Sequence, residues 1–214
     1  SIASIFEVSS RPVLKILADA TPELASQQAK ALQFEQSTED WQELVNHPEV
    51  DVVDITAPNH LHHPIAIAAL NLGKPVYCEK PLACTLAEAE EMADFAKAQQ
   101  IPTLVGYNYL QNPLMKTARE IVQSGEIGEP ISFRGVHAED YMANPLSPYT
   151  TRLDASQGGG VLYDLGSHII SLARYLAGPI QEVLGTLTTV VRERPTNSGN
   201  TREVFVDDQT HCLV

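Results

Sequence analysis

The sequence predicts an α/β fold in which a doubly wound parallel sheet is followed by an α+β region with a mostly antiparallel sheet. Short apolar runs alternate with amphipathic helical stretches over residues 13–106, a pattern typical of β-α-β units. Beyond Gly106 the alternation stops, and two strand-like runs follow one another without a crossover helix. We therefore expect a nucleotide-binding domain over residues 1–106 and a substrate or oligomerisation domain over 107–214.

The first region contains four predicted strands and four predicted helices. The strands are the apolar runs PVLKILAD, DVVDIT, KPVYC and PTLVG. The intervening helices are predicted over residues 22–33, 38–47, 60–72 and 85–100. Thr21 precedes a proline as a helix cap, and Asn59 and Gly73 bracket the third helix. Thr85 followed by Glu88 forms a capping box, which satisfies backbone donors at the start of the fourth helix.

The second region is predicted to mix helices and strands. A helix over 112–124 leads to the strand-like run ISFRGVHAEDY, and a loop then reaches the glycine triplet Gly158–Gly160. A long helix over 161–177 places one apolar stripe on a core; the stripe consists of Leu162, Leu165, Ile169, Leu172 and Leu176. Two further strands are expected over 181–193 and 203–214.

Composition narrows the classes of partner. The 214 residues are 43% apolar, with a mean hydropathy of -0.11, which is sufficient for one large or two modest cores. A net charge of -13 disfavours nucleic acid and anionic membrane surfaces. No apolar stretch approaches the roughly 20 residues that span a bilayer. Three cysteines match no zinc or disulfide framework, so we expect no metal site, reduced thiols and a cytoplasmic location.

Asp19 follows the first predicted strand, where a doubly wound sheet presents an acid to a ribose 2′-hydroxyl. A carboxylate there would repel a 2′-phosphate, and Ala20 offers no compensating charge, so the pattern favours NAD over NADP. An ordinary loop acid is the alternative. The glycine-rich turn should lie about 20 residues upstream, yet only eighteen residues precede Asp19 and none is glycine. We therefore expect an incomplete Rossmann-type doubly wound parallel sheet and, because THCLV reads as mid-strand, a truncated C-terminal region.

Two loops at the carboxyl edge of the predicted sheet carry candidate binding residues. The segment Thr56-Ala57-Pro58-Asn59-His60-Leu61-His62 ends one strand and opens a helix, which places small side chains and backbone donors where dinucleotides bind. Simple capping by Asn59 and a surface position for His62 are the structural alternatives. Glu79-Lys80-Pro81 ends the next strand, where Lys80 can hold a substrate hydroxyl beside the nicotinamide, aimed by a Lys–Pro bond that can be cis.

Three segments resemble the glucose–fructose oxidoreductase/inositol dehydrogenase (Gfo/Idh/MocA) family. The run NHLHHPIAIAALNLGKPVYCEKPLACTLAEAEEMADFAK is similar to the signature region of that family. GGGVLYDLGSHIISLARYLAG resembles its second motif, in which glycines precede an Asp, three residues and a His. VGYNYLQNP resembles the segment between the two domains of the family.

The resemblance implies roles for individual residues. Lys80, Asp164 and His168 would be catalytic, with His168 as general base and Asp164 its partner four residues away on one helix. Arg152 would join these three in holding substrate hydroxyls. The remaining residues would bind the cofactor: Asp19, Thr56, Asn59, His62, Glu79, Lys80, Pro81 and Asn108.

The resemblance implies an NAD(P)-dependent dehydrogenase that transfers a hydride between NAD(H) and a hydroxyl-bearing carbon of a sugar, cyclitol or related polyol. It also implies a homo-oligomer that assembles through the C-terminal sheet. Two alternatives remain open. One is a non-catalytic nucleotide- or sugar-binding sensor, because fold does not guarantee turnover. The other is an inactive structural fragment, whose exposed strand edges would pair subunits.

Overall fold

The computed structural model describes residues 12–214, which divide into two compact units. Within the described chain the first unit comprises residues 12–55, 64–77 and 94–103, and the second comprises 56–63, 78–93 and 104–214. No helix among residues 12–214 is both long enough and apolar enough to cross a membrane.

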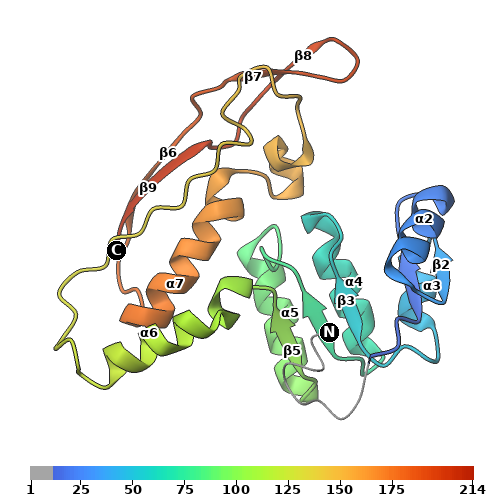
Figure 1. Ribbon diagram of the computed structural model, residues 1–214. Helices are drawn as coiled ribbons and strands as arrows, with labels where there is room; N and C mark the ends of the chain where they lie inside the picture. Colours follow the sequence, from blue (N-terminus) through green and yellow to red (C-terminus); the bar gives the residue numbers. More distant parts are fainter. Residues whose placement is uncertain (1–11) are drawn as a thin grey trace. The chain divides into compact units, whose positions relative to one another are not determined.

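The first unit opens with a small α/β layer. β1 (Ile16–Ala18) and β2 (Gln36–Thr38) pair in parallel, with Ile16 opposite Gln36. α2 (Pro22–Leu32) and α3 (Trp41–Asn46) pack on this pair, as the blue segments of Figure 1 show. The sequence did not predict β2, because Gln36, Ser37 and Thr38 carry none of the apolar signal that identified the other strands.

A three-stranded sheet follows in the order β3-β4-β5. The chain alternates strictly here, through β3 (Val53–Ile55), α4 (Asn59–Asn71), β4 (Val76–Cys78), α5 (Leu86–Gln99) and β5 (Thr103–Val105). Together with β1, these elements confirm the four predicted strands and the remaining helices, with shorter strands than expected. The apolar residues of β3 and β4 are buried, so the loops that leave these strands start from fixed points.

The predicted helix starts are confirmed in detail at two places. Thr21 Oγ1 accepts a hydrogen bond from the Leu24 backbone N–H at 3.3 Å. Thr85 and Glu88 satisfy each other's backbone N–H reciprocally, at 3.0 and 3.2 Å. Asn59 instead donates its side-chain amide to the Gly158 carbonyl at 3.2 Å, so this residue ties two loops together. The Lys80–Pro81 peptide bond is cis.

The second unit departs from one sequence prediction between residues 131 and 141. After η1 (Asn108–Gln111) and α6 (Pro113–Gln123), the run ISFRGVHAEDY forms no strand. Its composition suits a strand, but strand formation requires a neighbour that satisfies the backbone donors and acceptors. Among residues 12–214 no strand pairs with this run, so the prediction was wrong.

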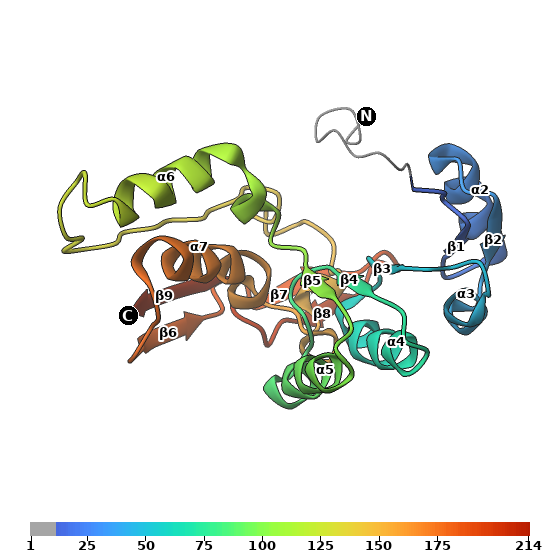
Figure 2. The same ribbon diagram turned by 90° about the horizontal axis from the view of Figure 1, so that it is seen from below.

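The long predicted helix begins with a π-helical turn. η4 (Leu162–Gly166) precedes α7 (Ser167–Ala177), and the Ser167 N–H reaches back five residues to the Leu162 carbonyl. A π turn holds more residues than an α turn and is often found at functional sites. Asp164 lies within this π turn, and His168 lies in the first turn of α7. Figure 2 shows α7 lying beside α6.

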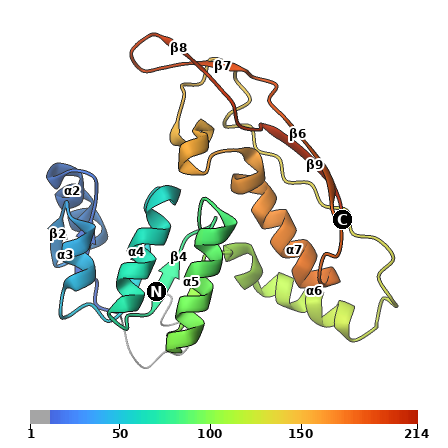
Figure 3. The same ribbon diagram turned by 180° about the vertical axis from the view of Figure 1, so that it is seen from behind.

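Four short strands close the chain, as two antiparallel pairs. β6 (Leu184–Thr188) pairs with β9 (Gln209–Leu213), and β7 (Glu193–Pro195) pairs with β8 (Thr201–Glu203). The β7–β8 hairpin extends past the other pair in Figure 3. The antiparallel arrangement confirms the prediction, although each predicted run divides between the two pairs. Leu153, Val204 and Val206 form a small buried core against Met142 and Tyr149.

Candidate active site

A cavity of about 390 Å³ in the second unit gathers most of the predicted site residues. Its walls come from three short segments: the loop after β3, the loop after β4, and the glycine triplet that precedes η4. These are joined by η2 (Thr151–Leu153) and by Asp164. The lining residues include Thr56, Asn59, His62, Glu79, Lys80, Pro81, Arg152, Gly158, Gly159, Gly160 and Asp164.

Lys80 and Asp164 form the central contact of this site, although 84 residues separate them in the chain. Lys80 Nζ donates to Asp164 Oδ1 at 2.8 Å and to the Asp164 main-chain oxygen at 2.9 Å. Both side chains are mostly buried, at 16% and 19% exposure. The π turn of η4 presents a carbonyl and a carboxylate of the same residue to one ammonium group.

The second oxygen of Asp164 has two further donors. Tyr141 Oη donates to Asp164 Oδ2 at 2.7 Å, and Arg152 Nη1 pairs with the same oxygen. Burial alone would raise the pKa of the Asp164 carboxyl. Hydrogen bonds from Lys80 and Tyr141, together with the charges of Lys80 and Arg152, outweigh burial and hold that pKa below its usual value. Asp164 is therefore an ionised acceptor at neutral pH.

Arg152 and Tyr141 also contact each other. Arg152 Nη1 donates to Tyr141 Oη at 3.2 Å, and the guanidinium carbon lies 5.3 Å from the tyrosine ring centroid. Burial raises the pKa of Tyr141, and its hydrogen bond to the Asp164 carboxylate raises it further. Tyr141 is thus a hydrogen-bond donor at neutral pH and is unsuited to removing a proton.

His168 lies in different surroundings. His168 is 6% exposed, and its Nδ1 atom has no hydrogen-bond partner among residues 12–214. Three rings surround it, with centroid distances of 4.5 Å to Tyr109, 5.7 Å to His137 and 6.4 Å to Tyr107. Burial, followed by the charges of Lys80 and His137, lowers the pKa of His168. The imidazole is therefore neutral near pH 7 and able to accept a proton.

His62 is 1% exposed and lines the cavity, and both of its ring nitrogens are already engaged. One nitrogen lies 2.8 Å from the Ala57 carbonyl and the other 2.9 Å from the Pro81 carbonyl. His62 thereby ties the loop after β3 to the turn that carries Lys80.

The glycine triplet is required by close packing. A methyl group on Gly159 would lie 2.6 Å from the Arg152 carbonyl oxygen, and Gly158 has a φ of +70°. At Gly160, which has a φ of +118°, an added methyl group would clash with the Asp207 carboxylate. A side chain at any of these positions would displace a wall of the cavity or strain the backbone.

Three of the predicted residues, His168, Asn108 and Asp19, are not on the wall of this cavity. Asn108 begins η1 with an exposed side chain and is absent from the cavity wall, whereas its neighbours Tyr107 and Tyr109 contact His168. Asp19 belongs to the other unit, where it follows β1 and its carboxylate accepts the Ala20 N–H at 2.7 Å. No cluster of three or more metal-ligating side chains occurs in the described part of the chain.

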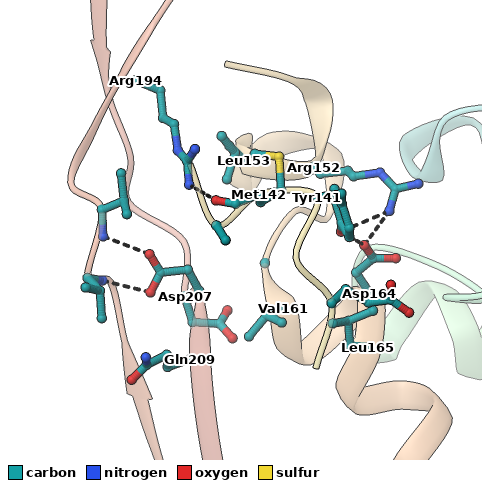
Figure 4. A pocket seen from close by; sticks show the side chains of 16 residues that line it. Tyr141, Met142, Arg152, Leu153, Val161, Asp164, Leu165, Arg194, Asp207 and Gln209 are labelled. Carbon is teal, nitrogen blue, oxygen red and sulfur yellow. Dashed lines mark hydrogen bonds and ion pairs between the residues drawn. The ribbon is translucent and has the colours of Figure 1, made fainter. Parts of the chain in front are cut away.

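A second cavity, of about 250 Å³, shares Arg152, Gly160 and Asp164 with the first. In Figure 4, Arg152, Asp164 and Tyr141 lie on one side of this second cavity, and Arg194 lies on the opposite wall. Arg194 is 2% exposed and donates to the carbonyls of Met142 and Asn144, at 2.7 and 2.5 Å. This arginine fixes the loop that follows Tyr141.

Sequence reasoning missed Tyr141, His137 and the two tyrosines beside His168. One signal was available: His137, Glu139 and Tyr141 are spaced two residues apart in the run predicted as a strand, as residues on one side of a strand would be. Likewise, Tyr107 and Tyr109 flank the predicted cofactor residue Asn108. Period-two spacing of polar and aromatic residues in a segment that leads to a site is therefore informative.

Two family models match adjoining parts of the chain. An oxidoreductase family with an NAD-binding Rossmann fold matches residues 2–107, and the GFO/IDH/MocA C-terminal domain matches residues 115–214. Together the matches cover nearly all of the sequence. They come from one family and occur in the expected order.

Individual relatives agree with the family match. A levoglucosan dehydrogenase from Pseudarthrobacter phenanthrenivorans is 44% identical over 189 residues, which is 88% of this chain and 48% of the relative. A myo-inositol 2-dehydrogenase from Thermotoga maritima is 27% identical over 189 residues, covering 88% of this chain and 54% of the relative. The chain thus spans about half the length of the curated relatives it matches.

Solved structures show the same architecture. A levoglucosan dehydrogenase in complex with NADH and L-sorbose aligns with a TM-score of 0.92 and 42% identity, over 95% of this chain and 55% of that one. An NAD binding oxidoreductase from Klebsiella pneumoniae aligns with a TM-score of 0.91 and 42% identity, over 98% and 57%. The chain belongs to the Gfo/Idh/MocA family of oxidoreductases.

Proposed function

We propose that the protein oxidises a hydroxyl-bearing carbon of a neutral sugar, cyclitol or related polyol and transfers the hydride to NAD. The observation that carries this proposal is the joining of Lys80 and Asp164 at the wall of a 390 Å³ cavity, with a neutral, buried histidine on the following turn. A positive charge that orients a hydroxyl and a base that removes its proton are the two protein groups such a reaction needs.

NAD supplies the hydride-accepting carbon when it is bound. Lys80 would donate a hydrogen bond to the substrate hydroxyl, while Asp164 and the turn after β4 hold the ammonium in place. His168 would accept the hydroxyl proton, for which its lowered pKa suits it. Arg152, still 56% exposed, would contact a neighbouring substrate hydroxyl.

The cavity fits a nicotinamide ribose on chemical grounds. Thr56, Asn59, Glu79 and Pro81 give it small and polar walls, and the closely packed glycines leave the space beside Lys80 open. Asn108 and His62 would act at its margin, His62 by fixing the Lys80 turn. Asp19 would bind the adenosine ribose and favour NAD over NADP, because its carboxylate would repel a 2′-phosphate.

A direct test is to incubate the full-length protein with NAD and a panel of levoglucosan, myo-inositol and D-xylose, and to measure NADH formation. We expect turnover with at least one of them. Lys80→Met should lower kcat/KM by about ten- to a hundredfold, the value of a hydrogen bond from a charged group. The control is Lys74→Met, because Lys74 lies outside the cavity and donates to the His47 carbonyl. Equal rates for wild type and Lys80→Met would remove Lys80 from the mechanism.

Cofactor preference offers a second test. Asp19→Ala removes one acceptor and one repulsive charge, so the ratio of kcat/KM for NAD to that for NADP should fall by about tenfold or more. Asp51→Ala serves as a control acid outside the predicted ribose site. An unchanged ratio in Asp19→Ala would make Asp19 an ordinary loop acid.

We also propose roles for the two parts of the chain, a surface for subunit assembly and a cellular location. Residues 1–106 would bind the nucleotide, and residues 107–214 would contribute substrate contacts and the sheet through which subunits assemble in the cytoplasm. Leu184, Leu187 and Leu213 support the assembly proposal, since each is more than 60% exposed on the β6–β9 pair. Light scattering of wild type and Leu187→Lys would test it, with a lower mass expected for the variant.

A further inference from the structure

His168 is buried, although the proposed reaction would place a proton on it in every turnover. Oxidation of a hydroxyl by NAD releases one proton per turnover, and in the proposed mechanism His168 accepts it. At 6% exposure, His168 has little contact with solvent through which to lose that proton. Since a base must be neutral again before the next turnover, the proton needs a path outward.

The surroundings of His168 contain one titratable side chain suited to that path. Lys80, Glu79 and Asp164 all act on His168 electrostatically. Lys80 and Asp164, however, are hydrogen-bonded to each other. Glu79, itself a predicted cofactor residue, accepts the Lys80 backbone N–H. Burial raises the pKa of Tyr107, so this tyrosine keeps its proton at neutral pH. Tyr109 packs on His168 by its ring, with the centroids 4.5 Å apart.

The remaining neighbour is His137. Its ring centroid lies 5.7 Å from that of His168 and 5.8 Å from that of Tyr109. His137 Nε2 lies 3.3 Å from Glu139 Oε1, and the side-chain exposure increases from 15% at His137 to 45% at Glu139. The order His168, His137, Glu139 therefore runs from the buried base to an exposed carboxylate.

We propose that His137 and Glu139 form the proton-release path from His168 to solvent. This inference rests on the proposed function, because it concerns the proton which that reaction produces. Histidine suits the intermediate position, since one ring nitrogen can accept a proton while the other donates one. Glu139 Oε1 lies 3.3 Å from His137 Nε2 and forms the exposed end of this path.

In the proposed oxidation the substrate C–H bond breaks, and its electron pair leaves with the hydride, which reduces NAD. The hydroxyl O–H bond breaks and its proton passes to His168, then through His137 or a water beside it to the Glu139 side of the site, and finally to bulk solvent. His168 and His137 both return to the neutral state, so neither residue is consumed.

The decisive variant is His137→Phe, which keeps an aromatic ring beside His168 and removes the titratable nitrogens. In the full-length protein, stopped-flow absorbance would follow NADH formation while a pH-indicator dye in weak buffer follows proton release. In wild type the two signals should rise together. In His137→Phe we expect first-turnover NADH formation within about twofold of wild type and proton release slowed by about tenfold or more, restored by added imidazole, as for loss of a general acid–base relay.

The matched control is His63→Phe. His63 forms a comparable surface pair, with its Nε2 2.8 Å from Glu91 Oε2, but it does not line the cavity. This variant should leave both signals unchanged. Unchanged proton release in His137→Phe would overturn the proposal. Equal slowing of both signals without imidazole rescue would also overturn it, because it would indicate a role in packing alone.

A cofactor-free measurement separates this proposal from the proposed function. The charge of His137 lowers the pKa of His168, so in a histidine NMR titration His137→Phe should move the His168 titration to higher pH. An unmoved His168 titration would show that the two rings do not communicate and would overturn the path. Absence of NADH formation in wild type would instead count against the proposed function.

Discussion

Asp164 and His168 lie four residues apart, yet they occupy opposite kinds of environment. Asp164 receives hydrogen bonds from Lys80, Tyr141 and Arg152 on its two carboxylate oxygens. His168 packs among aromatic rings, and its Nδ1 has no partner in the described residues. The pKa values of both residues lie below their usual values, for different reasons: hydrogen bonds from Lys80 and Tyr141 together with nearby positive charges in the first case, and burial in the second.

Asp164 and His168 belong to one sequence motif, but their different surroundings suit them to different tasks. A carboxylate with a lowered pKa stays ionised and holds Lys80 and Arg152 in place. An imidazole with a lowered pKa stays neutral and is ready to accept a proton. Asp164 lies in the π turn of η4, whereas His168 lies in the first turn of α7. In the proposed mechanism Asp164 would act mainly as an organiser of cations.

The largest expected effect comes from replacing the neutral base. His168→Asn should lower kcat by roughly 10²–10⁴, the usual contribution of general acid–base catalysis. Its acid limb in the pH profile of kcat/KM should disappear, since in wild type activity falls as pH drops through the lowered pKa of His168. NADH affinity, measured by fluorescence titration, should change little. A persistent acid limb with less than a tenfold loss in kcat, well under the general-base range, would place the base elsewhere.

Asp164→Asn should have a smaller effect on kcat than His168→Asn and a larger effect on stability. The variant keeps the shape but loses the charge that pairs with Lys80 and Arg152, so the unfolding free energy should fall by about 1.5–3 kcal/mol, the range for hydrogen bonds to charged groups. Urea denaturation of both variants checks the order. If His168→Asn proved the less stable of the two, the division between organiser and base would be wrong.

Tyr141→Phe tests a single donor on the organiser side. It removes the 2.7 Å hydrogen bond to Asp164 Oδ2 but leaves the Arg152 contact, so kcat/KM should fall by about two- to tenfold, equivalent to 0.5–1.5 kcal/mol. Tyr163→Phe is the control, because its hydroxyl donates to the Cys84 carbonyl instead. Equal losses in the two variants would deny Tyr141 a specific role.

The smallest effect should be seen in the pH dependence of stability. Both groups have lowered pKa values in the folded state, so each contributes stability that is present above its unfolded pKa and lost as pH falls through the folded one. For His168 the loss begins below about 6.5, and for Asp164 below about 3.9. Urea melts at several pH values should therefore lose the first component in His168→Asn and the second in Asp164→Asn. Identical pH profiles for the two variants would contradict the assignment.

The sequence by itself determined the elements whose signals are local. The apolar runs of β3, β4 and β5, the Thr21 cap and the Thr85–Glu88 capping box depend on neighbours a few residues away, and all are present in the structure. Lys80 was placed at a strand end because a buried strand followed by a loop is also a local pattern. The family resemblance implied that Lys80 and Asp164 are both catalytic, but their contact with each other was not predicted.

Only the tertiary structure decided the features that depend on distant partners. β2 has a weak signal and forms because β1 offers it a parallel edge, whereas residues 131–141 have a strong signal and no strand beside them. The three donors on Asp164 come from positions 80, 141 and 152. The aromatic surroundings of His168 are equally non-local. Charge pairing and burial depend on distance in space. Sequence spacing could therefore identify Asp164 and His168 as site residues, but it could not show that their surroundings differ.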